Sequence, residues 1–86
     1  MKLEGLVYEW LDLGRQDLAS AEFLLAMSPM PLEVIGFHCQ QALEKHLKAF
    51  LVQQGTEPER THDLLFLLQS CLTYDPSLEA LKEACA

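Results

Sequence analysis

A stripe of polar side chains on a predicted helix is the part of this sequence best suited to chemistry. Within residues 37–49, Gln41, Glu44, Lys45 and Lys48 recur at i, i+3, i+4 and i+7. Helical residues at these spacings share a face, so the four should form one stripe. The two lysines could hold a partner or a phosphate-bearing ligand, with Gln41 donating hydrogen bonds. In the alternative, Glu44 and Lys48 form an ordinary ion pair worth about 0.3–0.5 kcal/mol, and Lys45 is solvated.

A second polar group is predicted at the start of a later helix, where His62 precedes Asp63. The positive end of a helix favours the Asp63 carboxylate and disfavours a protonated His62. We expect His62 to tie the preceding connector to the rest of the protein through a hydrogen bond. The alternative is that His62 and Asp63 contact a ligand together.

The remaining reactive residue types do not form a catalytic or metal-binding pattern. His38 and His46 are eight positions apart, without an HxxxH pair, and we expect each to be packed or paired on its helix. Cys39, Cys71 and Cys85 have no CxxC spacing and predict reduced thiols acting as small core residues. No serine lies in a His/Asp pattern. We therefore predict no catalytic residue, no metal ligand and no cofactor.

Length and charge limit the class of protein. The 86 residues predict one domain, 1–86, with a modest core. A formal net charge of −7 disfavours non-specific binding to nucleic acid, so we expect no DNA partner. No apolar run approaches about 18 residues, which predicts no membrane span. The first residues lack the long apolar stretch of a signal peptide, and the expected location is the cytoplasm.

Two long helices are predicted to form an antiparallel hairpin. Apolar gaps of three and four define the first helix, which ends before the Ser-Pro-Met-Pro segment at 28–31. A second pattern runs from Pro31 to Gln54, about 36 Å long, and Gly55 is a natural residue to end it. Gly14 interrupts the first helix, and we expect another helix to approach closely there.

Two shorter helices should follow. Thr61 is expected to cap the third, and Asp75 with Pro76 to begin a fourth that runs to the end of the chain. No segment has the alternation of a strand. The predicted fold is all-α: an up-and-down antiparallel helical bundle built on a long two-helix hairpin plus two shorter helices. The residues expected in the core or at an interface are Trp10, Phe23, Phe37, Phe50 and Phe66.

The second helix also predicts self-association. It is apolar around more than half of its circumference, through Phe37, Leu43, Leu47, Phe50 and Leu51. A two-layer bundle of this size cannot cover all of that surface, and large exposed apolar patches usually mark an interface. We expect a homodimer.

Three groups of residues together resemble a known family. They are Asp17-Leu18 with Ala21, then Phe37, Gln41-Ala42, Glu44-Lys45 and Leu47-Lys48-Ala49, and finally Thr61-His62-Asp63-Leu64 with Leu67 and Leu68. Over about residues 10–70 the chain resembles the HEPN (higher eukaryotes and prokaryotes nucleotide-binding) domain family. The resemblance is to its prokaryotic branch, whose members occur beside minimal nucleotidyltransferases. It implies a dimerising bundle that normally has one more long helix, often with an Arg-Tyr-Pro sequence, so residues 1–86 are expected to lack the last helix.

The resemblance implies a non-catalytic module that dimerises and partners a minimal nucleotidyltransferase in a toxin–antitoxin-like system, with nucleotide contact through Lys45 and Lys48. Two alternatives stay open. Some relatives are metal-independent ribonucleases with an Arg followed, after four to six residues, by His. Arg15 has no such His, and Arg60 precedes His62 by only two positions. The last alternative is a plain helical protein-interaction domain without a nucleotide role.

Overall fold

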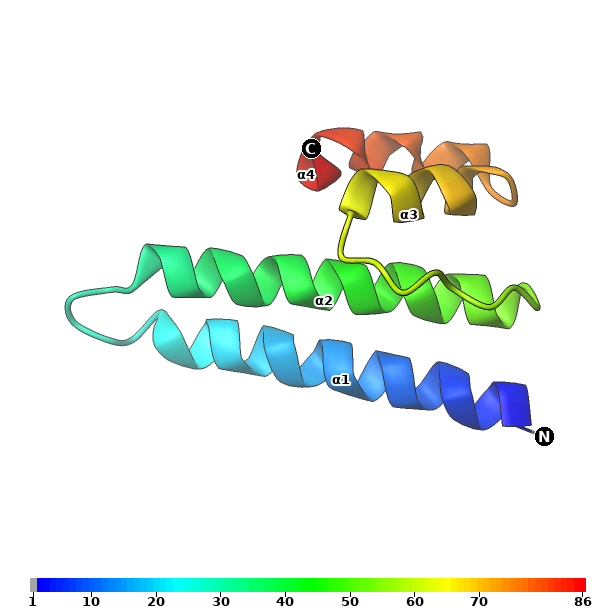
Figure 1. Cartoon of the computed structure of the whole chain (residues 1–86). Helices are drawn as coiled ribbons and strands as arrows, with labels where there is room; N and C mark the ends of the chain where they lie inside the picture. Colours follow the sequence, from blue (N-terminus) through cyan, green and yellow to red (C-terminus); the bar gives the residue numbers. More distant parts are fainter. Residues whose placement is uncertain (1) are drawn as a thin grey trace.

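The computed structural model describes residues 2–86, with side chains from residue 4, and every regular element in this range is helical (Figure 1). The elements are α1 (Lys2–Leu24), α2 (Leu32–Gln53), α3 (Leu64–Leu72), the 3₁₀ helix η1 (Pro76–Leu81) and α4 (Lys82–Cys85). The all-α prediction, with a long hairpin and shorter helices after it, is confirmed. Among the helices of residues 2–86, none has an apolar stretch long enough to cross a bilayer.

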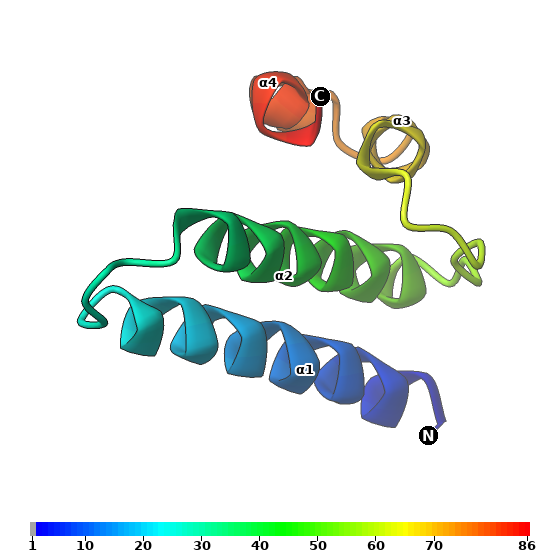
Figure 2. The same cartoon turned by 60° about the vertical axis from the view of Figure 1, so that its left-hand side comes forward.

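Helix α2 is the middle layer of the molecule. α1 runs antiparallel along one side of it, whereas α3, η1 and α4 lie on the opposite side (Figures 1 and 2). This C-terminal layer covers only the part of α2 that is distant from the α1–α2 connection, and the connected end of the hairpin projects beyond it. The two faces of α2 therefore meet different neighbours, and within residues 2–86 its first turns have a neighbour on the α1 side alone.

The ends of α2 follow the predicted signals. Pro31 directly precedes the first helical residue, Leu32. At the other end Gly55 has a φ of +86°, a backbone conformation that an L side chain disfavours. The Gly55 N–H donates to the Val52 carbonyl at 2.9 Å, and the Thr56 N–H donates to the Leu51 carbonyl at 2.9 Å. The chain thus turns sharply out of α2 and begins the connector, residues 56–63.

The prediction that Thr61 caps the third helix is wrong. Asp63 is the N-cap of α3, because its Oδ1 accepts a hydrogen bond from the Phe66 N–H at 3.1 Å. The Thr61 hydroxyl instead accepts the Asp63 N–H at 3.1 Å and shapes the turn before the helix. Both residue types bind backbone N–H groups well, so composition alone did not decide which one starts the helix.

The fourth helical segment also differs from its prediction. Asp75 caps it and Pro76 occupies its first position, as expected, but the segment is the 3₁₀ helix η1 followed by the single turn of α4. A 3₁₀ helix aligns residues three positions apart on one face. Leu78 and Leu81 have that spacing, and both pack against the core. Tighter winding therefore directs both leucines inward.

The apolar core lies between α2 and the C-terminal layer. Leu47 and Leu51 of α2 pack in one buried cluster with residues of α3 and α4. The other buried members of this cluster are Leu67, Leu68, Cys71 and Cys85. Burial, with a smaller contribution from Cys85, raises the pKa of the Cys71 thiol to about 11. Two cysteines are thus small core residues as predicted, but the prediction is wrong for Cys39, which is exposed.

The predicted aromatic core is only partly found. Phe50 packs against the buried cluster, and Trp10 is half-buried on α1. Phe23, Phe37 and Phe66 are exposed and so do not belong to the core. That these three residues lie at an interface instead stays a prediction.

The seam between α1 and α2 is built from small residues. Gly14, Ala21 and Ala42 are all buried. A Cβ added at Gly14 would lie 2.8 Å from Cε1 of His46, closer than real side chains approach. The expected close approach of another helix at Gly14 is therefore confirmed, and His46 of α2 is the group that approaches.

Gly14→Ala should test this contact, because its effect on the free energy of unfolding should have opposite signs in the wild type and in a His46→Ala background. In the wild type we expect destabilisation, because the new methyl must displace the His46 ring, whose Nδ1 contacts the Ala42 carbonyl oxygen at 2.6 Å. In a His46→Ala background the same change should stabilise by up to about 1 kcal/mol, the gain in helix propensity. Urea unfolding of the four proteins measures both values. An equal effect in the two backgrounds would contradict the contact.

Candidate functional site

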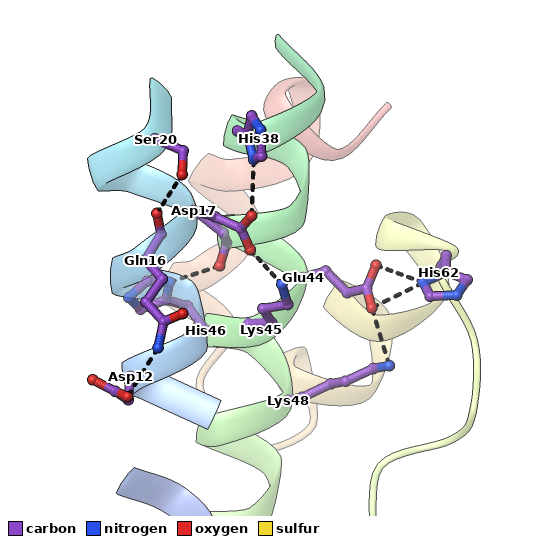
Figure 3. A network of polar contacts seen from close by, with 11 residues as sticks. Asp12, Gln16, Asp17, Ser20, His38, Glu44, Lys45, His46, Lys48 and His62 are labelled. Atoms are coloured by element: carbon purple, nitrogen blue, oxygen red, sulfur yellow. Dashed lines mark hydrogen bonds and ion pairs between the residues drawn. The ribbon is translucent and has the colours of Figure 1, made fainter. Parts of the chain in front are cut away.

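The predicted polar stripe lies along α2, but its side chains belong to two separate clusters. Figure 3 shows Lys45 directed towards Asp17 and His38, while Glu44 and Lys48 face His62. Gln41 is half-buried on the same helix. Each cluster has one carboxylate, one lysine and one histidine, and the two clusters join α2 to different layers.

The first cluster is centred on the buried carboxylate of Glu44. It accepts a hydrogen bond from Lys48 Nζ at 3.1 Å and contacts Nδ1 of His62 at 2.9 and 3.0 Å. The side chains of Glu44 and Lys48 are only 4% and 7% exposed, whereas that of His62 is 83% exposed. Because the carboxylate is an acceptor, His62 must donate through Nδ1, and this orients its ring.

This cluster fixes the position of α3. His62 ends the connector, and the next residue, Asp63, begins α3 as its cap. The hydrogen bond to Glu44 therefore anchors the start of α3 against α2. The expectation that His62 ties the connector to the bundle is confirmed, and the carboxylate of Asp63 is engaged in capping.

Lys48 also contacts α1. Its Nζ lies 5.2 Å from the ring centroid of Trp10, within the range of a cation–π interaction. The indole Nε1 of Trp10 is buried and has no hydrogen-bond partner within the described part of the chain. A shallow groove of about 280 Å³ opens here, lined by Leu6, Trp10, Lys48, Glu57, Pro58, Glu59 and Arg60. Lys48 is thus shared between α1, α2 and the groove beside the connector.

The second cluster joins α1 to α2. The Asp17 carboxylate of α1 accepts a hydrogen bond from Lys45 and contacts Nδ1 of His38 at 3.0 Å. Burial by itself would raise the pKa of Asp17, but the hydrogen bonds and charges of Lys45 and His38 outweigh it and hold this pKa below its ordinary value of 3.8. His38 is therefore paired, as expected, but Lys45 is not the solvated lysine of the alternative interpretation.

Sequence reasoning did not assign a role to Asp17. Its signal was its position three residues after Gly14 and four residues before Ala21, on the face of the first helix that meets α2. The pairing depends on the register of two helices that are distant in sequence, and periodicity within one helix does not give that register.

Both clusters are close to electrically balanced. Each cluster pairs one carboxylate with one ammonium group, Asp17 with Lys45 and Glu44 with Lys48, so neither lysine is a free cation for an incoming phosphate. Residues 2–86 contain no group of three or more His, Cys, Asp or Glu side chains placed to hold a metal ion. What this arrangement does chemically is to hold three layers in register and to present the His62 ring and the groove at the surface.

The fold and these clusters define a small α-helical module whose central helix is paired by charge on both sides. The family model of the HEPN domain matches residues 7–86. The chain therefore belongs to the HEPN domain family. Neither the curated proteins nor the solved structures gave a match to this chain.

Removing one partner of the buried pair should cost far more than removing both. Glu44→Ala leaves the Lys48 ammonium buried without a counter-ion, and we expect a loss of about 3–5 kcal/mol in the free energy of unfolding. Glu44→Leu with Lys48→Met keeps the volume, removes both charges and should lose much less. Thermal and urea unfolding measure both. A double variant as unstable as Glu44→Ala would show that the ion pair is not what matters here.

Asp17 should make stability fall in acid. A carboxyl whose pKa is lowered by folding stabilises the native state at pH values above its pKa in the unfolded chain, which is about 3.8–3.9. This contribution to stability disappears as the pH falls through the lowered pKa of the folded state. The difference in stability between wild type and Asp17→Asn should therefore be largest near neutral pH and shrink below about pH 4. Asp12→Asn, which removes an exposed carboxylate of the same helix that accepts only from Gln16 four residues on, is the control for the loss of one negative charge. A constant Asp17→Asn difference from pH 7 to pH 2 would contradict the pairing.

Proposed function

We propose that this chain is a non-catalytic, cytoplasmic HEPN module of the prokaryotic branch that dimerises and partners a minimal nucleotidyltransferase in a toxin–antitoxin-like system. The observation that carries the proposal is that the charged candidates on α2 are all paired within the chain. Apolar side chains, in contrast, stay exposed on α1, α2 and their connection. A module of this kind is better suited to contacting proteins than to transforming a substrate.

The ribonuclease alternative finds little support in the geometry. The His62 ring is held by Glu44, and the nearest preceding arginine, Arg60, is two residues away rather than four to six. Arg15 lies on α1, and the contacts of that helix are mainly with α2. An Arg followed after four to six residues by His therefore does not occur within residues 1–86.

Nucleotide contact would involve lysines that are already paired within the chain. Lys45 and Lys48 already bind carboxylates, at Asp17 and Glu44, and a phosphate would have to compete with both. Lys48 nevertheless borders the groove, together with Arg60. A nucleotide role would thus use the groove side of Lys48, whereas the plain interaction domain would use no nucleotide at all.

Two measurements test the proposal. Affinity capture of the tagged chain from its native host should recover a nucleotidyltransferase, identified by mass spectrometry; repeated recovery of no such protein would overturn the partner assignment. Titration with ATP and with UTP then separates the nucleotide role from a plain interaction domain. Arg60→Ala should weaken any binding, because Arg60 is exposed and borders the groove, whereas Lys48→Ala would also unpair the buried Glu44. Lys82→Ala, an exposed lysine of α4, is the control.

The enzyme alternative has its own test. We expect the purified protein to leave single-stranded RNA intact, because residues 1–86 contain no Arg followed after four to six residues by His. Cleavage that disappears in His62→Ala but persists in Asp63→Ala would overturn the non-catalytic assignment and favour the ribonuclease. Circular dichroism shows whether each variant keeps its helices.

A further inference from the structure

The exposed apolar surface of the molecule is concentrated at one end. We call this end, residues 23–37, the hairpin end: the last turn of α1, the connection and the first turns of α2. Among the large apolar side chains that are at least 46% exposed in the described part of the chain, all except Tyr8 belong to it. They are Phe23, Leu25, Met27, Leu32, Val34 and Phe37. Scattered exposed apolar residues need no explanation, but six within such a short segment do.

The hairpin end is also nearly free of charge. Residues 23–37 contain one charged side chain, Glu33, although the chain as a whole has a net charge of −7. Two copies of such an acidic protein repel each other over most of their surfaces. The hairpin end is where that repulsion is smallest and where the most apolar surface can be buried.

The C-terminal layer does not cover this end. In the apolar cluster that α2 shares with α3, η1 and α4, the first residue of α2 is Leu43, and the hairpin end projects past that layer in both views (Figures 1 and 2). If a large apolar residue offers roughly 150–200 Å² when fully exposed, the six side chains together present roughly 550–700 Å². A standard protein–protein interface takes about 800 Å² from each partner, so the patch is large enough to supply most of one.

We propose that the hairpin end is the surface through which two copies of this chain associate. This inference rests on the dimerisation in the proposed function and gives that dimer a location. Contacts between identical subunits are more apolar than those of transient complexes between different proteins, and the composition of the hairpin end fits the former. A patch at one end that binds its own copy about a two-fold axis gives a closed dimer. The absence of Lys and Arg from residues 23–37 disfavours an anionic lipid surface as the occupant.

The test is sedimentation at about 10–100 µM of the wild type and of the double variant Phe23→Ser/Phe37→Ser. We expect the wild type to dimerise and the double variant to raise the dimer dissociation constant at least about tenfold. Tyr8→Ser/Phe66→Ser is the matched control: it also removes two exposed aromatic side chains, one near the other end of α1 and one on α3. The control should change the dissociation constant less than about twofold, and circular dichroism should show both variants folded.

A spin label gives an independent readout of the same contact. Cys39 is exposed and lies two residues after Phe37, whereas Cys71 and Cys85 are buried, so a thiol reagent should label Cys39 selectively. In a dimer joined at the hairpin end, the distance between the two labels should be shorter than the 43 Å length of one copy. Joining through the opposite end would separate them further, because about 21 Å of α2 lies between Cys39 and Gln53 on each side.

The possible results separate this inference from the proposed function. A dimer that both double variants weaken equally, or that neither weakens, overturns the assigned surface and leaves dimerisation standing. A wild type that is monomeric at 100 µM overturns both. A dimer that persists in Phe23→Ser/Phe37→Ser while capture of the nucleotidyltransferase is lost would make the hairpin end the partner's surface. Binding of the monomer to phosphatidylcholine vesicles, lost in the same variant, would make it a lipid contact.

Discussion

The rest of this structure depends on two charged side chains buried in the middle helix. Glu44 and Lys48 lose most of their contact with water, a loss that only good pairing and further hydrogen bonds offset. Lys48 supplies the opposite charge and donates to one carboxylate oxygen, and Nδ1 of His62, from outside the helix, lies within hydrogen-bond distance of both oxygens. Since His62 must sit at that carboxylate, the connector has to follow α2 and α3 has to begin beside it. The need of the buried Glu44 carboxylate for a hydrogen-bond partner thus helps to position the C-terminal layer.

A similar arrangement operates on the other side of α2, but with the acid on the neighbouring helix. Asp17 of α1 accepts from Lys45 and contacts His38. Here the seam is lined by small residues, so the helices approach closely and the polar cluster is what fixes their register. The apolar cluster, in contrast, is confined to the C-terminal side. The middle helix is therefore joined to α1 by small buried residues and the Asp17 cluster. It is joined to the C-terminal layer by the apolar cluster and the contact between Glu44 and His62. These pairings leave few of its charges for ligands.

The sequence predicted mainly those features that depend on neighbouring residues, and few of those that depend on contacts between helices. Apolar periodicity placed the helices, and Asp75, Pro76 and Gly55 marked ends that involve only neighbouring residues. The i, i+4 pairing of Glu44 with Lys48 was likewise visible within one helix. The choice between Thr61 and Asp63 as cap was not, because both side chains can bind backbone N–H groups and the packing of α3 decides where it starts. The partner of Lys45 could not be predicted either, since it comes from another helix whose register the sequence pattern leaves free.

The order in which the layers pack has a consequence for how the chain reaches this structure. The main packing contacts join α1 with α2, α2 with α3, and α3 with η1 and α4, so each element rests on one that directly precedes it along the chain. Topologies dominated by such near-neighbour contacts have low contact order and fold on the microsecond-to-millisecond scale. Elongation by a ribosome is far slower, at about 5–20 residues per second. We expect the α1–α2 hairpin to form as soon as it emerges during synthesis, so that its exposed tip is available to a neighbouring nascent chain before the C-terminal layer has been made.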